Sequence, residues 1–284
     1  MSLKNFVLFL LPALVFSALL YYGIFWNIAI ALTHYSVLDP TMRFTGLSSF
    51  VELFSDSLFV SAFIRTLLWA ALLVALGNLI GLLLAGAIFQ FENIRLRNML
   101  TTFFLYPFSL SLVVVGIIWR WLYDPYKGID NILAVLGLPR IQWLEGDTAF
   151  WSLVLTSIWV YAGFVALLYL AMFYNIDKSL IESALVDGAG PLTILTKIVI
   201  PNSKQGLIIA TIFLALFAIQ MFDLPYSVLY LNPFTMTMVM YVYAKFASFY
   251  FYLASAAAIV IVVVSAFIVI PYAVYGLKRW ILGR

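Results

Sequence analysis

The chain has 284 residues, of which 65% are hydrophobic and only 10% are charged. A soluble domain is about 45–50% apolar, so this composition indicates an integral membrane protein. There is no cysteine, one histidine and a net charge of +3 without a cluster of Lys and Arg, which argues against disulfides, a histidine metal site and a nucleic-acid-binding surface.

Six long apolar runs follow one another along the chain, and each exceeds the roughly 20 residues that span about 30 Å of hydrocarbon. We expect transmembrane helices at about 6–32, 62–90, 98–121, 149–173, 205–231 and 253–277. The first run is longer than the apolar core of a signal peptide, and no small-x-small cleavage site ends it, so we interpret it as an uncleaved helix. The prediction is one all-α polytopic membrane domain over residues 1–284.

The second expected helix carries small residues at one-turn spacing, Gly77, Gly81 and Ala85. Such a stripe lets another helix approach closely, and we expect it to serve packing within this chain. The third expected helix contains Pro107 near its start.

The only polar interval of its length in the second half of the chain is 177–204, between the fourth and fifth expected helices. Its apolar residues fall at helical spacing in two groups, Leu180, Ile181, Ala184 and Leu185, and then Leu192, Leu195, Ile198 and Val199. Gly188 and Gly190 separate the groups, Pro191 suits the first turn of a new helix and Pro201 closes it. The pattern predicts a helix-turn-helix at the membrane surface. Both a cap over the neighbouring helix ends and a docking lever for a partner fit this pattern.

Gln220 and Asp223 are polar residues in the fifth apolar run, and Pro225 follows them closely. A charge at the bilayer centre costs about 2.5–3.5 kcal/mol, so it calls for a partner or water. Two interpretations remain open: a hydrated kink on a solute path, and a structural carboxylate near a helix end.

Lysine and arginine are more numerous in the termini and even-numbered loops than on the other side. These residues are Lys4, Arg95, Arg97, Lys178, Lys197, Lys204, Lys278, Arg279 and Arg284. By the positive-inside rule, both termini and the 177–204 loop are expected in the cytoplasm, in a multi-pass protein of the cell membrane.

The loop resembles the signature of permease subunits of ATP-binding-cassette (ABC) importers: Glu-Ala-Ala, three residues, Gly, nine residues, Ile, one residue, Leu and Pro. This chain has Glu182-Ser183-Ala184, Gly188 and Ile198-Val199-Ile200-Pro201 at the same spacing, with Ser for Ala and Ile for Leu. Asp187-Gly188-Ala189 is similar to the carbohydrate branch, that of the maltose and glycerol-phosphate permeases, which usually has Phe where this chain has Leu195.

The resemblance implies a permease subunit that forms half of the path for a sugar or sugar-like solute. Its partners would be a second homologous permease, two cytoplasmic ATPase subunits and an extracytoplasmic solute-binding protein, in a heteromeric complex in the lipid bilayer. The implied coupling residues are Glu182, Ser183, Ala184, Asp187, Gly188, Ala189, Leu195, Ile198 and Pro201.

The chain has no G-x-x-x-x-G-K-[ST] motif, so ATP would be bound by partner subunits and this chain would need no cofactor of its own. The sequence does not indicate an enzyme, because it has no metal-ligand cluster, no nucleophile with a base and no paired carboxylates within one membrane crossing. The alternative is an ATP-independent secondary transporter or channel, for which inverted repeats or a chain of intramembrane acids would be expected.

Overall fold

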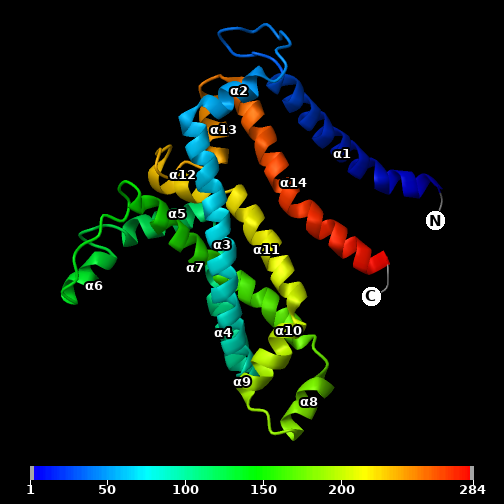
Figure 1. Ribbon diagram of the computed structural model, residues 1–284, viewed down its shortest axis with the longest axis vertical. Helices are drawn as coiled ribbons and strands as arrows, with labels where there is room; N and C mark the ends of the chain where they lie inside the picture. Colours follow the sequence, from blue (N-terminus) through cyan, green and yellow to red (C-terminus); the bar gives the residue numbers. More distant parts are fainter. Residues whose placement is uncertain (1–2, 282–284) are drawn as a thin grey trace. The chain divides into compact units, whose positions relative to one another are not determined.

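A computed structural model describes residues 3–281, and the side chains of residues 10–271. Within these residues the regular structure is helical, apart from an isolated antiparallel bridge between Thr33 and Phe44. The elements are α1 (Leu3–Ala31), α2 (Ser48–Ser55), α3 (Ser57–Phe89), α4 (Ile94–Ser109), α5 (Leu112–Leu122), α6 (Ile129–Val135), α7 (Thr148–Tyr174), α8 (Lys178–Val186), α9 (Pro191–Ile194), the π-helical segment η1 (Leu195–Val199), α10 (Ile200–Asn202), α11 (Lys204–Ile219), α12 (Asp223–Leu229), α13 (Met238–Ala247) and α14 (Phe251–Ile281) (Figure 1).

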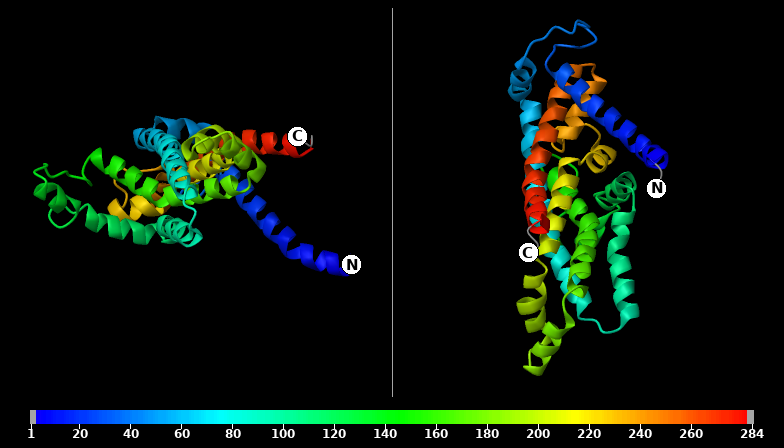
Figure 2. Two further views of the ribbon diagram at one scale, coloured as in Figure 1. Left: turned by 90° about the horizontal axis from the view of Figure 1, so that it is seen from below. Right: turned by 90° about the vertical axis from the view of Figure 1, so that its right-hand side faces the viewer.

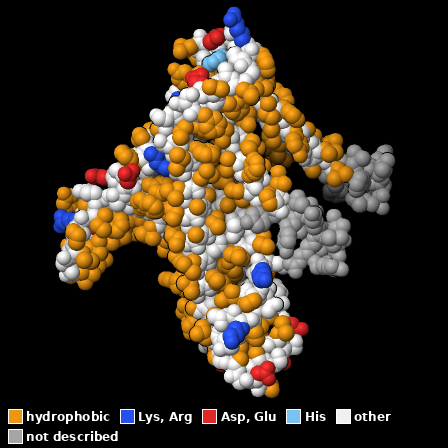
Figure 3. All heavy atoms as spheres, viewed as in Figure 1, with side chains coloured by type: hydrophobic (Ala, Val, Ile, Leu, Met, Phe, Trp, Pro, Cys, Tyr) orange, Lys and Arg blue, Asp and Glu red, His pale blue; other side chains and the backbone are white. Residues whose placement is uncertain are grey.

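The described residues contain five segments long and apolar enough to cross a membrane. They are Leu10–Ala31, Ser57–Phe89, Thr148–Tyr174, Lys204–Leu229 and Phe251–Pro271. The number rises to six if α4 and α5 are counted as one bent span. Hydrophobic side chains cover most of the face seen in Figure 3. The expectation of an all-α polytopic membrane protein is confirmed.

The helix expected over 98–121 is not continuous. It is divided into α4 and α5, which are bent by 96° at Leu110 and Ser111, two residues with extended backbone. Pro107 lies in the last turn of α4, where it lacks the N–H that would bond to the carbonyl four residues earlier. The chain leaves the helix within that same turn.

The helix expected over 205–231 is also interrupted. Residues 220–222 separate α11 from α12, and α12 begins at Asp223. Pro225 is the third residue of α12, a position in the first turn where its missing N–H has no helical partner to lose. The interruption therefore precedes Asp223 and lies before Pro225 in the chain. The structure also forms short helices in stretches expected outside the spans, namely α2, α6 and α13.

The helices group into two compact units. Unit 1 comprises the chain up to Phe63 together with Met238–Val264, and unit 2 comprises Ile64–Thr237 together with the chain from Ser265. Each unit is described by itself.

Unit 2 is built around α7, much of which is buried, with α4 and α11 packed against it. Glycines permit the close packing: a Cβ on Gly163 of α7 would overlap the backbone carbonyl of Phe104 in α4. The small-residue stripe of α3 also packs within the chain, since a Cβ on Gly81 would lie 2.6 Å from the Cβ of Val165 in α7. A Cβ on Gly77 would lie 3.1 Å from Cδ1 of Leu214 in α11.

Several polar side chains in the core of unit 2 form hydrogen bonds with one another. The indole Nε1 of Trp69 donates to the Ser157 hydroxyl at 2.9 Å. Asn78 of α3 accepts a hydrogen bond from the Tyr169 hydroxyl at 3.0 Å, and its amide donates to the Thr211 hydroxyl at 3.3 Å. Buried polar groups stabilise a fold only when they are paired, so these bonds tie α3, α7 and α11 together.

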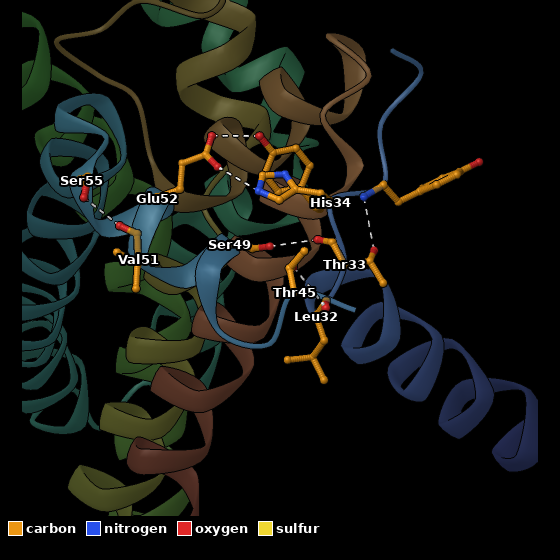
Figure 4. Close-up of polar contacts among 10 residues, drawn as sticks. Leu32, Thr33, His34, Thr45, Ser49, Val51, Glu52 and Ser55 are labelled. Carbon is orange, nitrogen blue, oxygen red and sulfur yellow. Dashed lines mark hydrogen bonds and ion pairs between the residues drawn. The ribbon is translucent and has the colours of Figure 1, made fainter. Parts of the chain in front are cut away.

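Unit 1 is held by hydrogen bonds between α2 and its neighbours. The Ser49 hydroxyl donates to the backbone carbonyl of Thr33 at 3.0 Å, and the Glu52 carboxylate accepts from the Tyr252 hydroxyl at 2.9 Å (Figure 4). His34 lies against the Tyr252 ring, with 4.4 Å between the ring centres. The segment after α1, α2 and the start of α14 are thus fixed to one another.

Candidate functional site

The polar stretch 177–204 forms a helical hairpin (hereafter the hairpin). Figures 1 and 2 show it extending from the end of unit 2 at which α3 ends and α4 begins. Its first limb is α8, and its second limb runs without a loop through α9, η1 and α10. The two limbs are joined by residues 187–190.

The first limb begins at an acidic cap and ends at a glycine. Asp177 caps α8, because its carboxylate accepts a hydrogen bond from the Ser179 amide at 3.0 Å. Hydrogen bonds from the amide and the side chain of Ser179 hold the pKa of the Asp177 carboxyl below its usual value. At the other end, Gly188 has a φ of +78°, which a residue with a Cβ rarely adopts. Its amide bonds to the Leu185 carbonyl, and the Ala189 amide bonds to the Ala184 carbonyl, which together make a Schellman motif.

The second limb is anchored in the core of unit 2. Ile194, Leu195 and Val199 are all buried there, with Leu195 only 7% exposed. Cδ2 of Leu195 would lie 3.0 Å from a Cβ on Gly86 of α3, so the absence of a side chain at Gly86 makes room for Leu195. Leu195 therefore contacts its own chain. Gly86 is a residue that sequence reasoning missed, and its only signal was a further small residue beside the predicted stripe of α3.

The middle of the second limb is π-helical. The Ile200 amide donates to the Leu195 carbonyl, five residues back. Pro201 has no N–H and cannot complete the regular α-helical pattern at this point, which favours the wider turn. The Ser203 hydroxyl donates to the Val199 carbonyl at 2.7 Å and continues the limb into α11. Pro201 therefore lies within a nearly continuous helical path, although the sequence had suggested that it closes the helix.

The first limb is exposed. No residue of α8 is buried, and Glu182, Ser183 and Asp187 project into solvent in the described chain. Of the apolar face predicted for α8, only Ile181 and Ala184 pack against the core. The others, Leu180 and Leu185, are 45% and 56% exposed.

The remaining predicted residues fall in two places. In the hairpin, Ala184, Ala189 and Ile198 are half-buried, and Gly188 and Pro201 are exposed. Gln220 and Asp223 lie on either side of the break between α11 and α12, and both are exposed. Both side chains therefore lie at the break within the span Lys204–Leu229.

No group of three His, Cys, Asp or Glu residues in the described part of the chain is arranged to hold a metal ion. The hairpin presents a surface. Its second limb is buried in the core of unit 2, and its first limb is exposed and can contact a partner. Such an arrangement can transmit movement between a partner and the spans.

Residues 77–280 match the family described as "Binding-protein-dependent transport system inner membrane component". The chain belongs to this family. It is a multi-pass membrane permease, a non-enzymatic subunit of an importer complex that works with a solute-binding protein. Membership does not support the ATP-independent transporter or channel.

Among similar proteins is the glucose import system permease protein GlcT of Saccharolobus solfataricus, 37% identical over 99% of both chains. The sn-glycerol-3-phosphate transport system permease protein UgpA of Yersinia pestis is 34% identical over 68% of this chain and 66% of its own. A chain in the crystal structure of a bacterial alginate ABC transporter, in complex with an alginate pentasaccharide-bound periplasmic protein, superposes with a TM-score of 0.81. It is 25% identical and covers 94% of this permease and 92% of that chain.

Proposed function

We propose that this permease forms half of the translocation path for a sugar or sugar-like solute, in an importer driven by cytoplasmic ATPase subunits. Two relatives are named for the import of glucose and of glycerol phosphate, and a similar chain belongs to an alginate transporter. These names support a hydroxyl-rich solute for this permease. A second homologous permease supplies the other half of the path. Gln220 and Asp223 lie at the break in a membrane span, where their polar groups can hydrogen-bond to solute hydroxyls.

The observation that carries the proposal is the unequal burial of the two hairpin limbs. The second limb places Leu195 and Val199 in the core of unit 2, whereas α8 presents Glu182 and Asp187 to solvent. Force applied to the exposed limb reaches α3 and α11 through the anchored limb. We therefore assign the coupling of ATP hydrolysis to the hairpin, with Glu182, Ser183, Ala184, Asp187, Gly188 and Ala189 forming the docking limb and turn, and Leu195, Ile198 and Pro201 lying on the anchoring limb.

We also propose how the chain is oriented in the membrane and which subunits bind ATP and solute. The excess of Lys and Arg near the hairpin supports a cytoplasmic location for the hairpin and for both termini. ATP is bound by two ATPase subunits, and the solute-binding protein delivers its cargo from the opposite side of the membrane. This chain contributes the path and the coupling surface.

Glu182→Arg tests the docking limb. Glu182 is exposed and its side chain forms no ion pair within the described residues, so the substitution should leave the fold intact. We expect the ATPase subunits that co-purify with a tagged permease to fall at least about tenfold, equivalent to about 1.4 kcal/mol, and solute uptake by proteoliposomes to fall with them. The melting temperature of the permease should not change.

Glu145→Arg is the matched control. It makes the same change of charge at another exposed glutamate, in the loop before α7. We expect normal ATPase recovery and uptake for this variant. If Glu182→Arg retained full ATPase recovery and uptake, the hairpin would not be the docking surface.

A further inference from the structure

A cavity of about 270 Å³ lies at the base of the hairpin. Its lining comes from the end of α3, the start of α4, the end of α7 and the first turn of α8. Two of these helices, α3 and α7, are membrane spans that end at Phe89 and Tyr174, and α4 begins a further apolar stretch at Ile94. Since all three meet the cavity at their ends, the cavity lies at the level of the bilayer surface.

Two cations line the cavity. The guanidinium of Arg97 lies 4.5 Å from the centre of the Tyr174 ring, which fixes its position by a cation–π contact. Lys178, the first residue of α8, lines the cavity from the hairpin side. Within the described part of the chain, neither cation forms an ion pair. Glu92 is the acidic residue in the lining, so the cavity has a net positive charge.

The rest of the lining is largely aromatic. Phe89 packs against Phe173 and Tyr174, with ring centres 5.5 and 5.6 Å apart, and Phe91 is 41% exposed beside them. A ligand that fits must combine an anionic group for Arg97 and Lys178 with an apolar portion for the aromatic rings. A phospholipid with an anionic head has this combination at this depth, and an arginine fork suits a phosphate.

We propose that this cavity binds the phosphate headgroup of an anionic phospholipid, with the first part of an acyl chain against Phe89 and Phe91. The bound lipid touches Lys178 and Ile181 and so supports the first limb of the hairpin. Lipid binding in this cavity is independent of which solute is carried and of which subunit docks to α8.

Native mass spectrometry of the complete, delipidated importer tests the site. Dioleoylphosphatidylglycerol and dioleoylphosphatidylcholine are titrated separately, followed by competition with millimolar inorganic phosphate. Each cation near a bilayer surface contributes about fivefold to the binding of an anionic lipid. We therefore expect Arg97→Gln and Lys178→Gln each to weaken phosphatidylglycerol binding about fivefold, and Glu92→Gln to strengthen it by a similar factor.

Arg95→Gln is the matched control, because Arg95 lies in the same turn of α4, is exposed and does not line the cavity. It should change the affinity less than about twofold. Arg97→Lys retains the charge and should restore most of the preference for phosphatidylglycerol. If the Arg97→Gln importer did not assemble, Lys178→Gln and Glu92→Gln would still test the site, because both side chains are exposed and their replacement should leave the fold intact.

Three results would overturn the assignment. Equal affinity for the two lipids would exclude headgroup recognition, and an equal loss in Arg95→Gln would indicate general surface charge. Displacement of the lipid by inorganic phosphate would indicate a site for the free anion, since a lipid also held by its chain should resist it.

Discussion

Leu195→Ala should loosen the second limb of the hairpin without altering the surface that a partner sees. Leu195 is 7% exposed, so the substitution deletes three well-buried carbon atoms. At about 0.8 kcal/mol per methylene the transfer loss is about 2.4 kcal/mol, and a residual cavity adds to it. The site lies at the end of unit 2, where neighbours can relax and leave only a small cavity, so we expect a total of about 2.4–3 kcal/mol.

This loss should appear as local opening. Hydrogen exchange of the full-length permease should show that amides of residues 194–203 lose protection by about 50- to 150-fold, because each 1.4 kcal/mol corresponds to a factor of ten. Amides in the centre of α7 should be unaffected. In the assembled importer, the ATPase subunits should still bind while solute uptake falls, since the docking limb is intact and its anchor is loose.

Leu192→Ala supplies the comparison, because it makes the same substitution on the same limb at a side chain that is 68% exposed. Its exchange protection should remain within about twofold of the original protein. The anchoring role of Leu195 would be refuted if Leu195→Ala left the protection of residues 194–203 unchanged, or if Leu192→Ala reduced it equally.

Three further substitutions test the two units separately, two in unit 2 and one in unit 1. Gly163→Ala places a Cβ against the Phe104 carbonyl, and an overpacking cost of about 1–3 kcal/mol should exceed the roughly 1 kcal/mol gained in helix propensity. The melting temperature of the detergent-solubilised protein should therefore fall by several degrees. Gly77→Ala, whose Cβ meets only methyl groups of Leu214 and Leu73, should change the melting temperature little, and equal melting temperatures for the two variants would contradict this reasoning. In unit 1, burial opposes ionisation of Asp56, but hydrogen bonds from Tyr241 and Lys245 outweigh the effect of burial and hold the pKa of that carboxyl below 3.8. The contribution of Asp56 to stability is therefore complete above about pH 4 and is lost as the pH falls through the lowered pKa. Asp56→Asn should reduce the dependence of the melting temperature on pH below 4, and an unchanged dependence would assign that dependence to other groups.

Hydropathy was sufficient to predict the all-helical membrane fold, because the length of an apolar run is a direct consequence of bilayer thickness. It was not sufficient to predict the 96° bend between α4 and α5. The residues at the bend, Leu110 and Ser111, are compatible with a helix, and a proline one turn earlier is tolerated in many spans. Whether Pro107 kinks a helix or ends it depends on tertiary packing.

The hairpin shows the same limit on a smaller scale. Gly188 and Pro191 predicted the turn correctly, because a positive φ and a first-turn proline are local requirements. The spacing of Leu195 predicted only that it belongs to an apolar face. The face packs against α3 because Gly86, more than a hundred residues earlier in the chain, leaves room for Leu195. Helical periodicity carries no information on such a pairing.

The π-helical segment at Leu195–Val199 has a consequence for sequence length. A π turn takes up one residue more than the α-helical turn it replaces, and the helices on either side keep their facing. Removing one residue from this stretch should therefore shorten the limb to an α-helix that lacks only the hydrogen bond of Pro201, and leave α11 in register with α7. Relatives that differ by one residue here can keep the same arrangement of spans, so a gap at this point in an alignment is compatible with an unchanged membrane core.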